Sequence, residues 1–132
     1  MAHAQSSVVL LENDISLSQA MERVLQASGF HTRAFRNLAS LMETQAAADA
    51  ACLVVDVSAA TEHGLGVREH LRVGRNTPII FISGYDEPET RAQAHAAGAA
   101  VYLPKPFTGR ALVEAIHRVL LGAAAGPAAA PA

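Results

Sequence analysis

Polar side chains that could carry out phosphoryl chemistry follow four apolar runs of this sequence. Glu12 and Asn13 follow VVLL, Asp56 comes near the end of CLVVDV, Ser83 ends PIIFIS, and Lys105 follows VYLP. Carboxylate and amide oxygens suit a hard cation such as Mg²⁺, whereas a hydroxyl and an ammonium suit a phosphoryl group. Phosphoryl transfer requires mainly positioning and charge stabilisation. The set therefore predicts phosphoryl transfer, with Asp56 as the nucleophile.

Each of these residues also has an ordinary explanation when it is taken alone. A carboxylate such as Asp56 at a strand end is often a helix cap or a solvated turn residue. Ser83 beside Gly84 suits a turn, and Lys105 before Pro106 suits a solvated surface position. The prediction depends on the joint occurrence of a suitable group at each of four strand ends.

Five short apolar runs predict the strands that must position these side chains. The runs are residues 8–11, 30–35, 52–57, 78–83 and 100–104. Four of them are almost continuously apolar, which is typical of strands covered on both faces. The run at 30–35 alternates, so we expect it at an edge of the sheet.

Helical patterns separate the strands. The first begins after a cap at Asp14 or Ser16 and ends at Gly29, and the second covers 38–48 after the cap Asn37. The third and fourth patterns cover 65–73 and 88–98, and the fifth begins near Thr108. Strict alternation of strand and helix predicts the α/β class, as a three-layer sandwich around a parallel sheet. The carboxyl ends of the strands then meet at one edge, where functional groups collect.

Length and composition narrow the class of protein. With 132 residues and 51% hydrophobic residues, we expect one domain over 1–121, followed by a flexible tail or linker stub at 122–132. A net charge of −2 lacks the basic excess of nucleic-acid binders. No apolar stretch is long enough to span a membrane, and the lone Cys52 suits a buried thiol in a reducing compartment. A cytoplasmic protein is expected. The six histidines lack the spacing of a zinc site, and we expect them at the surface.

At the residues identified above, the sequence resembles the receiver domains of bacterial two-component response regulators, over about residues 7–121. The most specific segment is AAGAAVYLPKPF at 96–107, which is similar to the family's fifth strand, its lysine and a proline that the family holds in cis. Ser83 in FISGYDEP matches the family's hydroxyl residue, and Gly64 follows Asp56 at the family's spacing. The resemblance implies a flavodoxin-like (βα)5 fold with a five-stranded parallel sheet in the order 2-1-3-4-5.

The resemblance also implies roles for individual residues. Asp56 would be the phosphoacceptor, assisted by Lys105 and Ser83, and the donor would be a histidine kinase or a phosphotransfer protein. Ser83 and Tyr102 would form the conformational switch. The face made by helix 88–98, strand 100–104 and the helix from Thr108 would carry the response, as a homodimer or a partner contact. Such a domain is a signalling module and not an enzyme.

The Mg²⁺ site implied by the resemblance consists of Glu12, Asn13, Asp56 and the backbone carbonyl of Ser58. The family usually has a second acid at the position of Asn13, where the side chain contacts the metal directly. An amide lacks that charge, so we expect weakened Mg²⁺ binding. Asp14 starts the first helix and should point elsewhere.

Two other functions compete with a phosphorylated switch. The amide at Asn13, together with Ala59 and Ala60 where the family usually has Met-Pro, suits a degenerate receiver that binds partners without phosphorylation. An aspartate-nucleophile phosphohydrolase would share the aspartate, hydroxyl and lysine. That enzyme class requires a second acid two residues after the nucleophile, where this chain has Ser58.

Overall fold

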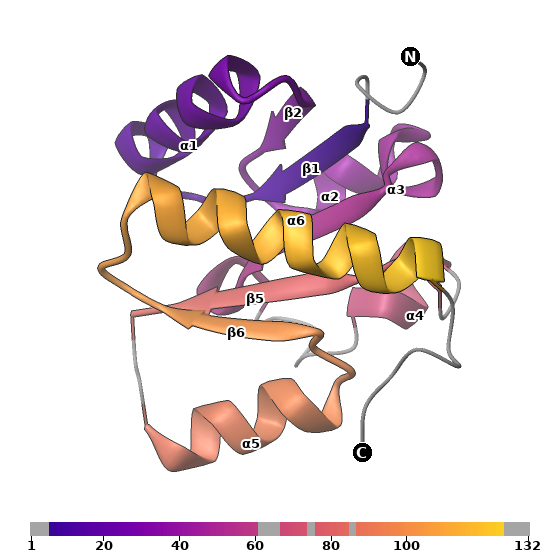
Figure 1. Cartoon of the computed structure of the whole chain (residues 1–132). Helices are drawn as coiled ribbons and strands as arrows, with labels where there is room; N and C mark the ends of the chain where they lie inside the picture. The colour runs from indigo at the N-terminus through magenta and orange to yellow at the C-terminus, as the bar shows by residue number, and fades with distance from the viewer. Residues whose placement is uncertain (1–5, 61–66, 74–75, 85–86, 126–132) are drawn as a thin grey trace.

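A computed structural model describes residues 6–60, 67–73, 76–84 and 87–125. Its five parallel strands are β1 (Ser7–Leu11), β2 (His31–Phe35), β3 (Cys52–Asp56), β5 (Ile79–Ser83) and β6 (Val101–Pro104). They form one sheet in the order β2-β1-β3-β5-β6 (Figure 1). Counted along the chain, this is the predicted order 2-1-3-4-5, so the flavodoxin-like α/β fold is confirmed.

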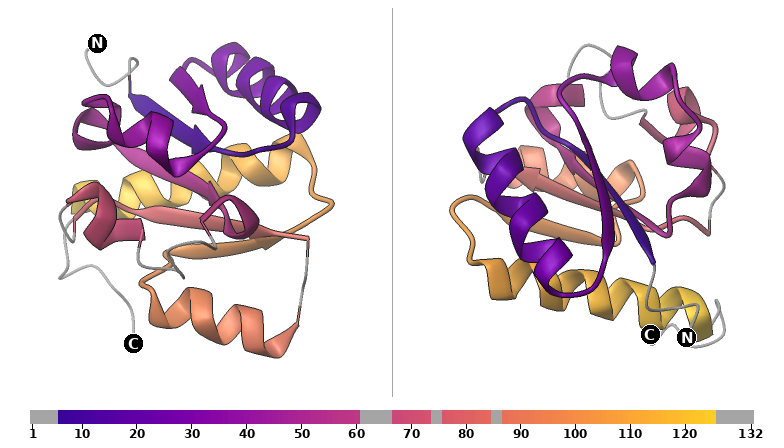
Figure 2. Two further views of the ribbon diagram at one scale, coloured as in Figure 1. Left: turned by 180° about the vertical axis from the view of Figure 1, so that it is seen from behind. Right: turned by 90° about the horizontal axis from the view of Figure 1, so that it is seen from above.

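The helices form a layer on each face of the sheet. Figure 2 shows α1 (Ile15–Ala27) and α6 (Gly109–Ala125) on one face. The other face carries α2 (Leu38–Met42), α3 (Ala46–Asp49), α4 (Val67–Leu71) and α5 (Pro88–Ala96). Alternate strand residues enter the two cores, so Val8 and Leu10 pack toward α1 and α6 whereas Val9 and Leu11 pack toward the other layer. This double burial explains the continuous apolar runs.

Burial along the strands follows the sequence pattern except in β6, whose apolar residues are only half-buried because this strand lies at one edge of the sheet. All residues of β3 and β5 are buried. Strand β2 lies at an edge of the sheet and leaves His31 and Arg33 exposed, as its alternating pattern predicted.

The predicted helix boundaries are confirmed at two N-termini and one C-terminus. Asp14 caps α1 because its carboxylate accepts a hydrogen bond from Leu17 N at 3.1 Å. Asn37 caps α2 by accepting one from Ser40 N at 2.8 Å. Gly29 follows α1 with a φ of 94°, a left-handed conformation that glycine adopts without a steric penalty.

The prediction of one helix over 38–48 is wrong. Helix α2 ends at Met42 and α3 begins at Ala46. Between them, the Thr44 hydroxyl donates to Leu41 O at 2.9 Å and accepts from Ala46 N at 3.1 Å. A side chain that satisfies backbone groups in this way competes with the helical hydrogen bonds.

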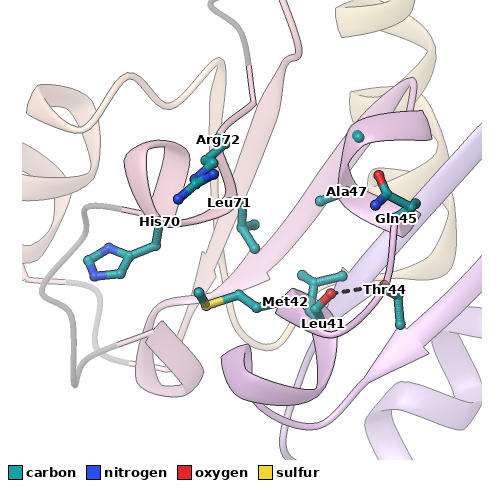
Figure 3. Close-up of a pocket in the computed structure, with 9 residues that line it drawn as sticks. Leu41, Met42, Thr44, Gln45, Ala47, His70, Leu71 and Arg72 are labelled. Atoms are coloured by element: carbon teal, nitrogen blue, oxygen red, sulfur yellow. Dashed lines mark hydrogen bonds between the residues drawn. The ribbon is translucent and has the colours of Figure 1, made fainter.

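A hollow of about 450 Å³ lies between this interrupted segment and α4. Figure 3 shows Leu41 and Met42 on one side and His70, Leu71 and Arg72 on the other. Arg72 has a φ of 57° directly after the last residue of α4, so the helix ends here with a left-handed residue that is not glycine.

The C-terminal segment also departs from the prediction. Helix α6 continues through Ala125, so the expected tail at 122–132 is helical over its first four residues. Alanine is the strongest helix former, which explains why GAAA extends the helix. Residues 126–132 lie outside the described part of the chain. Among the described residues, no helix is both long enough and apolar enough to cross a lipid bilayer.

Candidate functional site

The carboxyl edge of the sheet brings together side chains that are far apart in the sequence. Glu12 follows β1, Asp56 and Ser83 end β3 and β5, and Lys105 follows β6. Because neighbouring parallel strands end at the same edge, the register of the sheet fixes these groups next to one another.

Lys105 connects the two acidic side chains of this edge. Its ammonium nitrogen Nζ lies 3.0 Å from Asp56 Oδ2 and 3.3 Å from Glu12 Oε1. The lysine side chain is 25% exposed, whereas the carboxylates of Glu12 and Asp56 are 0% and 2% exposed. A charge-assisted contact between largely buried groups holds its geometry more firmly than a surface ion pair does. The Lys105–Pro106 peptide bond is cis, as the family resemblance implied.

Asp56 is held in the form that a nucleophile requires. Its Oδ1 accepts a hydrogen bond from Ser58 N at 3.0 Å, within the short 3₁₀ helix η2 (Val57–Ala60). Burial acts to raise the pKa of Asp56, but the neighbouring Glu12 carboxyl, the Lys105 ammonium and the Ser58 N–H outweigh it, so the pKa is lowered. The carboxylate is therefore ionised at neutral pH.

Glu12 responds to the same surroundings in the opposite direction. Its Oε2 accepts a hydrogen bond from Asp14 N at 3.0 Å, while Oε1 is buried and accepts none from the described residues. Burial, followed by the proximity of Asp56, raises the pKa of Glu12 to about 7. Two adjacent buried carboxylates share one ammonium, and the second carboxylate keeps its proton more readily.

This arrangement fits a hard divalent cation, except that the amide of Asn13 takes the place of a carboxylate. The buried Oε1 of Glu12 and the carboxylate of Asp56 are oxygen ligands of the kind that Mg²⁺ prefers. Asn13 follows Glu12 in the chain, is exposed, and lines a broad hollow of about 1220 Å³ together with Ser58 and Ala59. The described residues contain no cluster of three histidine, cysteine or acidic side chains that could hold a metal. The oxygen donors are suitable, and their negative charge is low.

Asp14 does not supply the missing charge in this structure. Its carboxylate caps α1 through Leu17 N, and its own backbone N–H donates to Glu12. This position agrees with the expectation that Asp14 starts the first helix and points elsewhere.

The two residues expected to form a switch lie on neighbouring strands. Ser83 is buried at the end of β5, where its carbonyl accepts a hydrogen bond from Lys105 N at 2.8 Å. Tyr102 is half-buried on the edge strand β6, opposite Phe81 of β5. The Arg91 guanidinium carbon lies 5.0 Å from the centre of the Tyr102 ring. This contact was not predicted, because the sequence does not show which face of α5 meets the sheet.

Other predicted features are also accounted for. His31, His70, His95 and His117 are exposed, as expected, whereas His3 and His63 lie outside the described residues. Gly64, whose spacing from Asp56 contributed to the resemblance, lies outside them as well. Cys52 is buried in β3, and burial raises the pKa of its thiol to about 12, consistent with an unreactive core residue.

Comparisons with known proteins agree with this geometry. The response regulator receiver domain family model matches residues 8–117. The response regulator protein TodT of Pseudomonas putida is 28% identical over 121 residues, covering 91% of this chain and 53% of TodT. The cell cycle transcriptional regulator CtrA of Caulobacter vibrioides is 30% identical over 114 residues, covering 86% of this chain and 49% of CtrA. The chain thus spans about half the length of these relatives.

Solved structures show the same fold. A response regulator receiver protein from Burkholderia phymatum is 28% identical with a TM-score of 0.76, over 88% of this chain and 95% of that one. A CheY-like receiver domain protein from Methanospirillum hungatei is 17% identical with a TM-score of 0.80, over 92% and 98% of the two chains, and supports the fold alone. With the family model matching most of its length, this chain belongs to the response regulator receiver domain family of two-component systems.

Proposed function

We propose that this receiver domain accepts a phosphoryl group on Asp56 from a histidine kinase or a phosphotransfer protein. The observation that carries the proposal is the position of Lys105 Nζ, 3.0 Å from Asp56 Oδ2 and 3.3 Å from Glu12 Oε1. An ammonium already placed beside the nucleophile can stabilise the charge on the incoming phosphoryl oxygens with little rearrangement.

The reaction follows from the state of these side chains. One oxygen of the ionised Asp56 carboxylate would attack the phosphorus of a phosphohistidine, the P–N bond would break, and the imidazole would leave with the bonding electrons and a proton taken up from water. Lys105 would pair with the transferred oxygens, and Ser83 would offer its hydroxyl to them. These roles use three residues that the sheet places at one edge.

Glu12, Asn13, Asp56 and the Ser58 carbonyl would hold Mg²⁺ at this edge. The bound cation supplies charge neutralisation for the phosphoryl oxygens. The neutral Asn13 side chain leaves Glu12 and Asp56 as the acidic ligands, so we propose that binding is weak but retained.

Phosphorylation would act by shifting the population between two conformations. Ser83 and Tyr102 would rearrange, and the face formed by α5, β6 and α6 would carry the change to a second copy or to another partner. We propose that the domain makes no direct contact with nucleic acid and works in the cytoplasm. This proposal concerns the receiver domain alone, because relatives such as CtrA are named as transcriptional regulators.

The direct test is incubation with a small-molecule phosphodonor and Mg²⁺, followed by intact mass measurement. We expect one added phosphoryl group, located on Asp56 and absent from Asp56→Asn. Asp49→Asn, an exposed aspartate elsewhere, is the matched control and should be modified like the parent. If no phosphate is added at saturating Mg²⁺, the degenerate binding module becomes the better account. If Asp56→Asn is still phosphorylated, the assignment of the acceptor is wrong.

A further inference from the structure

Helix α5 is attached to the sheet by few contacts. Its sequence PETRAQAHA is polar. The structure describes every residue of α5, and Ala94 is the only one of them that is buried. Beyond its C-terminal end, the Arg68 guanidinium donates to Gly98 O at 3.4 Å and to Thr77 O at 2.8 Å, which ties the end of α5 to α4. Figure 1 shows α5 at the outer end of its layer, beside the edge strand β6.

Arg91 provides a side-chain contact nearer the start of α5. It lies three residues before Ala94 and therefore on the side of the helix that faces the sheet. Its guanidinium carbon is 5.0 Å from the centre of the Tyr102 ring, a distance at which the cation is attracted to the ring face. Arg91, His95 and Tyr102 together line a hollow of about 270 Å³ against β6.

The Tyr102 ring lies at the boundary between the core and the hollow beside α5. It packs, half-buried, against the core cluster that contains Phe81 and Ala94, and it also lines the hollow beside α5. The ring therefore has packed side chains on one side and the hollow on the other. The Arg91 guanidinium on the α5 side of the ring then favours the ring orientation that faces it.

We propose that Arg91 is a positioning residue for Tyr102. Its guanidinium stabilises the ring orientation that faces α5, so a reorientation of the ring away from α5 loses this contact. Cation–π contacts at exposed sites correspond to a population ratio of about two- to fivefold. The significance of the bias for signalling rests on the proposed function, in which Tyr102 reorients on phosphorylation.

The chain offers a matched control for this contact. Arg33 lies 5.2 Å from the centre of the Phe35 ring on β2, at the opposite edge of the sheet. Arg33→Gln removes an arginine–aromatic contact of the same kind without touching α5 or β6. Arg91→Lys keeps the charge but removes the planar guanidinium.

The test is NMR of the full chain with labelled tyrosine, with Tyr102 identified through Tyr102→Phe. The χ1 populations of Tyr102 are obtained from three-bond couplings in the absence of any phosphoryl analogue. We expect Arg91→Gln to shift them by about two- to fivefold, Arg91→Lys to shift them less, and Arg33→Gln to leave them unchanged. Unchanged populations in Arg91→Gln would overturn the proposal, and Arg91→Ala, which also removes the cation, decides the matter if the glutamine variant fails to fold.

A second measurement separates this proposal from the proposed function. Beryllofluoride with Mg²⁺, which mimics a phosphoryl group on a carboxylate, is titrated into the parent and Arg91→Gln. We expect half of the variant to be converted to the beryllofluoride-bound form at a beryllofluoride concentration about two- to fivefold lower than for the parent. The reason is that no guanidinium holds its Tyr102 ring toward α5. If the parent binds no beryllofluoride, the proposed function fails, while the χ1 populations of the unliganded protein still decide the role of Arg91.

Discussion

At the residue scale, the Lys105 ammonium pairs with the carboxylates of Asp56 and Glu12, whose pKa values move in opposite directions. The pKa of Asp56 is lowered, whereas burial and the Asp56 charge raise the pKa of Glu12 to about 7. Without a metal ion, the pair therefore binds a proton near neutral pH. A cation that replaces this proton completes the charge balance of the site.

The raised pKa of Glu12 predicts that stability without Mg²⁺ falls as the pH rises. The folded protein keeps the Glu12 proton up to about pH 7, while the unfolded chain loses it near the ordinary value of 4.5. The stabilisation is thus complete below pH 4.5 and is lost as the pH rises through 7. At about 1.4 kcal/mol for each pKa unit, the loss approaches about 3 kcal/mol.

Urea unfolding of the parent and Glu12→Gln, in chelator at pH 5 and pH 8, checks this prediction. We expect the unfolding free energy of the parent to fall between the two pH values by more than that of the variant. Parallel pH profiles for the two proteins would show that Glu12 is ionised throughout.

Asn13→Asp is expected to tighten Mg²⁺ binding. Two unit charges about 4 Å apart attract each other by about 4 kcal/mol at an effective dielectric of about 20, and a carboxylate in contact with a divalent cation is attracted more strongly, although hydration of both ions offsets most of this. We therefore expect at least about a tenfold gain in affinity, measured by calorimetric titration at fixed salt.

Asn76→Asp, the same change at an exposed position before β5, is the control for net charge. It should leave the Mg²⁺ affinity unchanged. Equal affinities of the parent and Asn13→Asp would mean that another acid already occupies the place of the missing ligand. Asp14 would be the first to examine, although it caps α1 in the structure.

At the scale of the elements, α1 and α6 approach closely at Gly109. A Cβ atom on Gly109 would lie 3.1 and 3.2 Å from the two methyl carbons of Val24. We predict that Gly109→Val lowers the unfolding free energy by about 1–3 kcal/mol, because the helices must separate or Val24 must leave its rotamer. Chemical denaturation with an unchanged m-value measures the effect.

Gly122 in the same helix is the natural comparison. Within the described part of the chain, a Cβ atom on Gly122 would meet no neighbouring group within 4 Å, so Gly122→Ala adds helix propensity without a clash. It should raise stability by up to about 1 kcal/mol. A stabilising Gly109→Val would show that α1 and α6 can separate at little cost.

The sequence predicted the elements where local signals dominate. Continuous apolar runs identified the buried strands, and Asp14 and Asn37 identified two helix starts, because a cap requires only a few neighbouring residues. The break at Thr44 was missed because a threonine hydroxyl can either point to solvent or bond to the backbone. The choice depends on packing against the sheet.

The site was predictable in composition but not in geometry. The types and order of Glu12, Asp56, Ser83 and Lys105 indicated phosphoryl chemistry at one edge. The sharing of Lys105 between two carboxylates depends on the register of β3, β5 and β6, which no local pattern contains. The contact of Arg91 with Tyr102 depends on how α5 is rotated about its axis.

At the scale of the whole molecule, the face of α5, β6 and α6 should transmit the response. Ala92 and Ala96 of α5 are exposed, whereas Ala94 packs into the core, so part of this alanine-rich helix remains available to a partner. We predict that beryllofluoride and Mg²⁺ change hydrogen exchange on this face and promote self-association, monitored by sedimentation.

Ala92→Arg should weaken that association without altering beryllofluoride binding. Ala20→Arg, at an exposed position of α1 outside the proposed face, should do neither. Exchange differences confined to α1 and the start of α2 would contradict the proposed output face.

The parallel sheet has a consequence for the fidelity of the signal. The Lys105 and Asp56 side chains that meet at the sheet edge are 49 residues apart, and Glu12 comes from the first strand. Asp56 therefore meets the Lys105 ammonium only after β3, β5 and β6 have assembled, and β1 must join them to add Glu12. A nascent, truncated or misfolded copy would still carry the Asp56 carboxylate but would lack the neighbours to which the proposed function assigns a role. Under the proposed function, tertiary assembly would therefore restrict phosphorylation to correctly folded molecules, which are the ones able to change conformation in response.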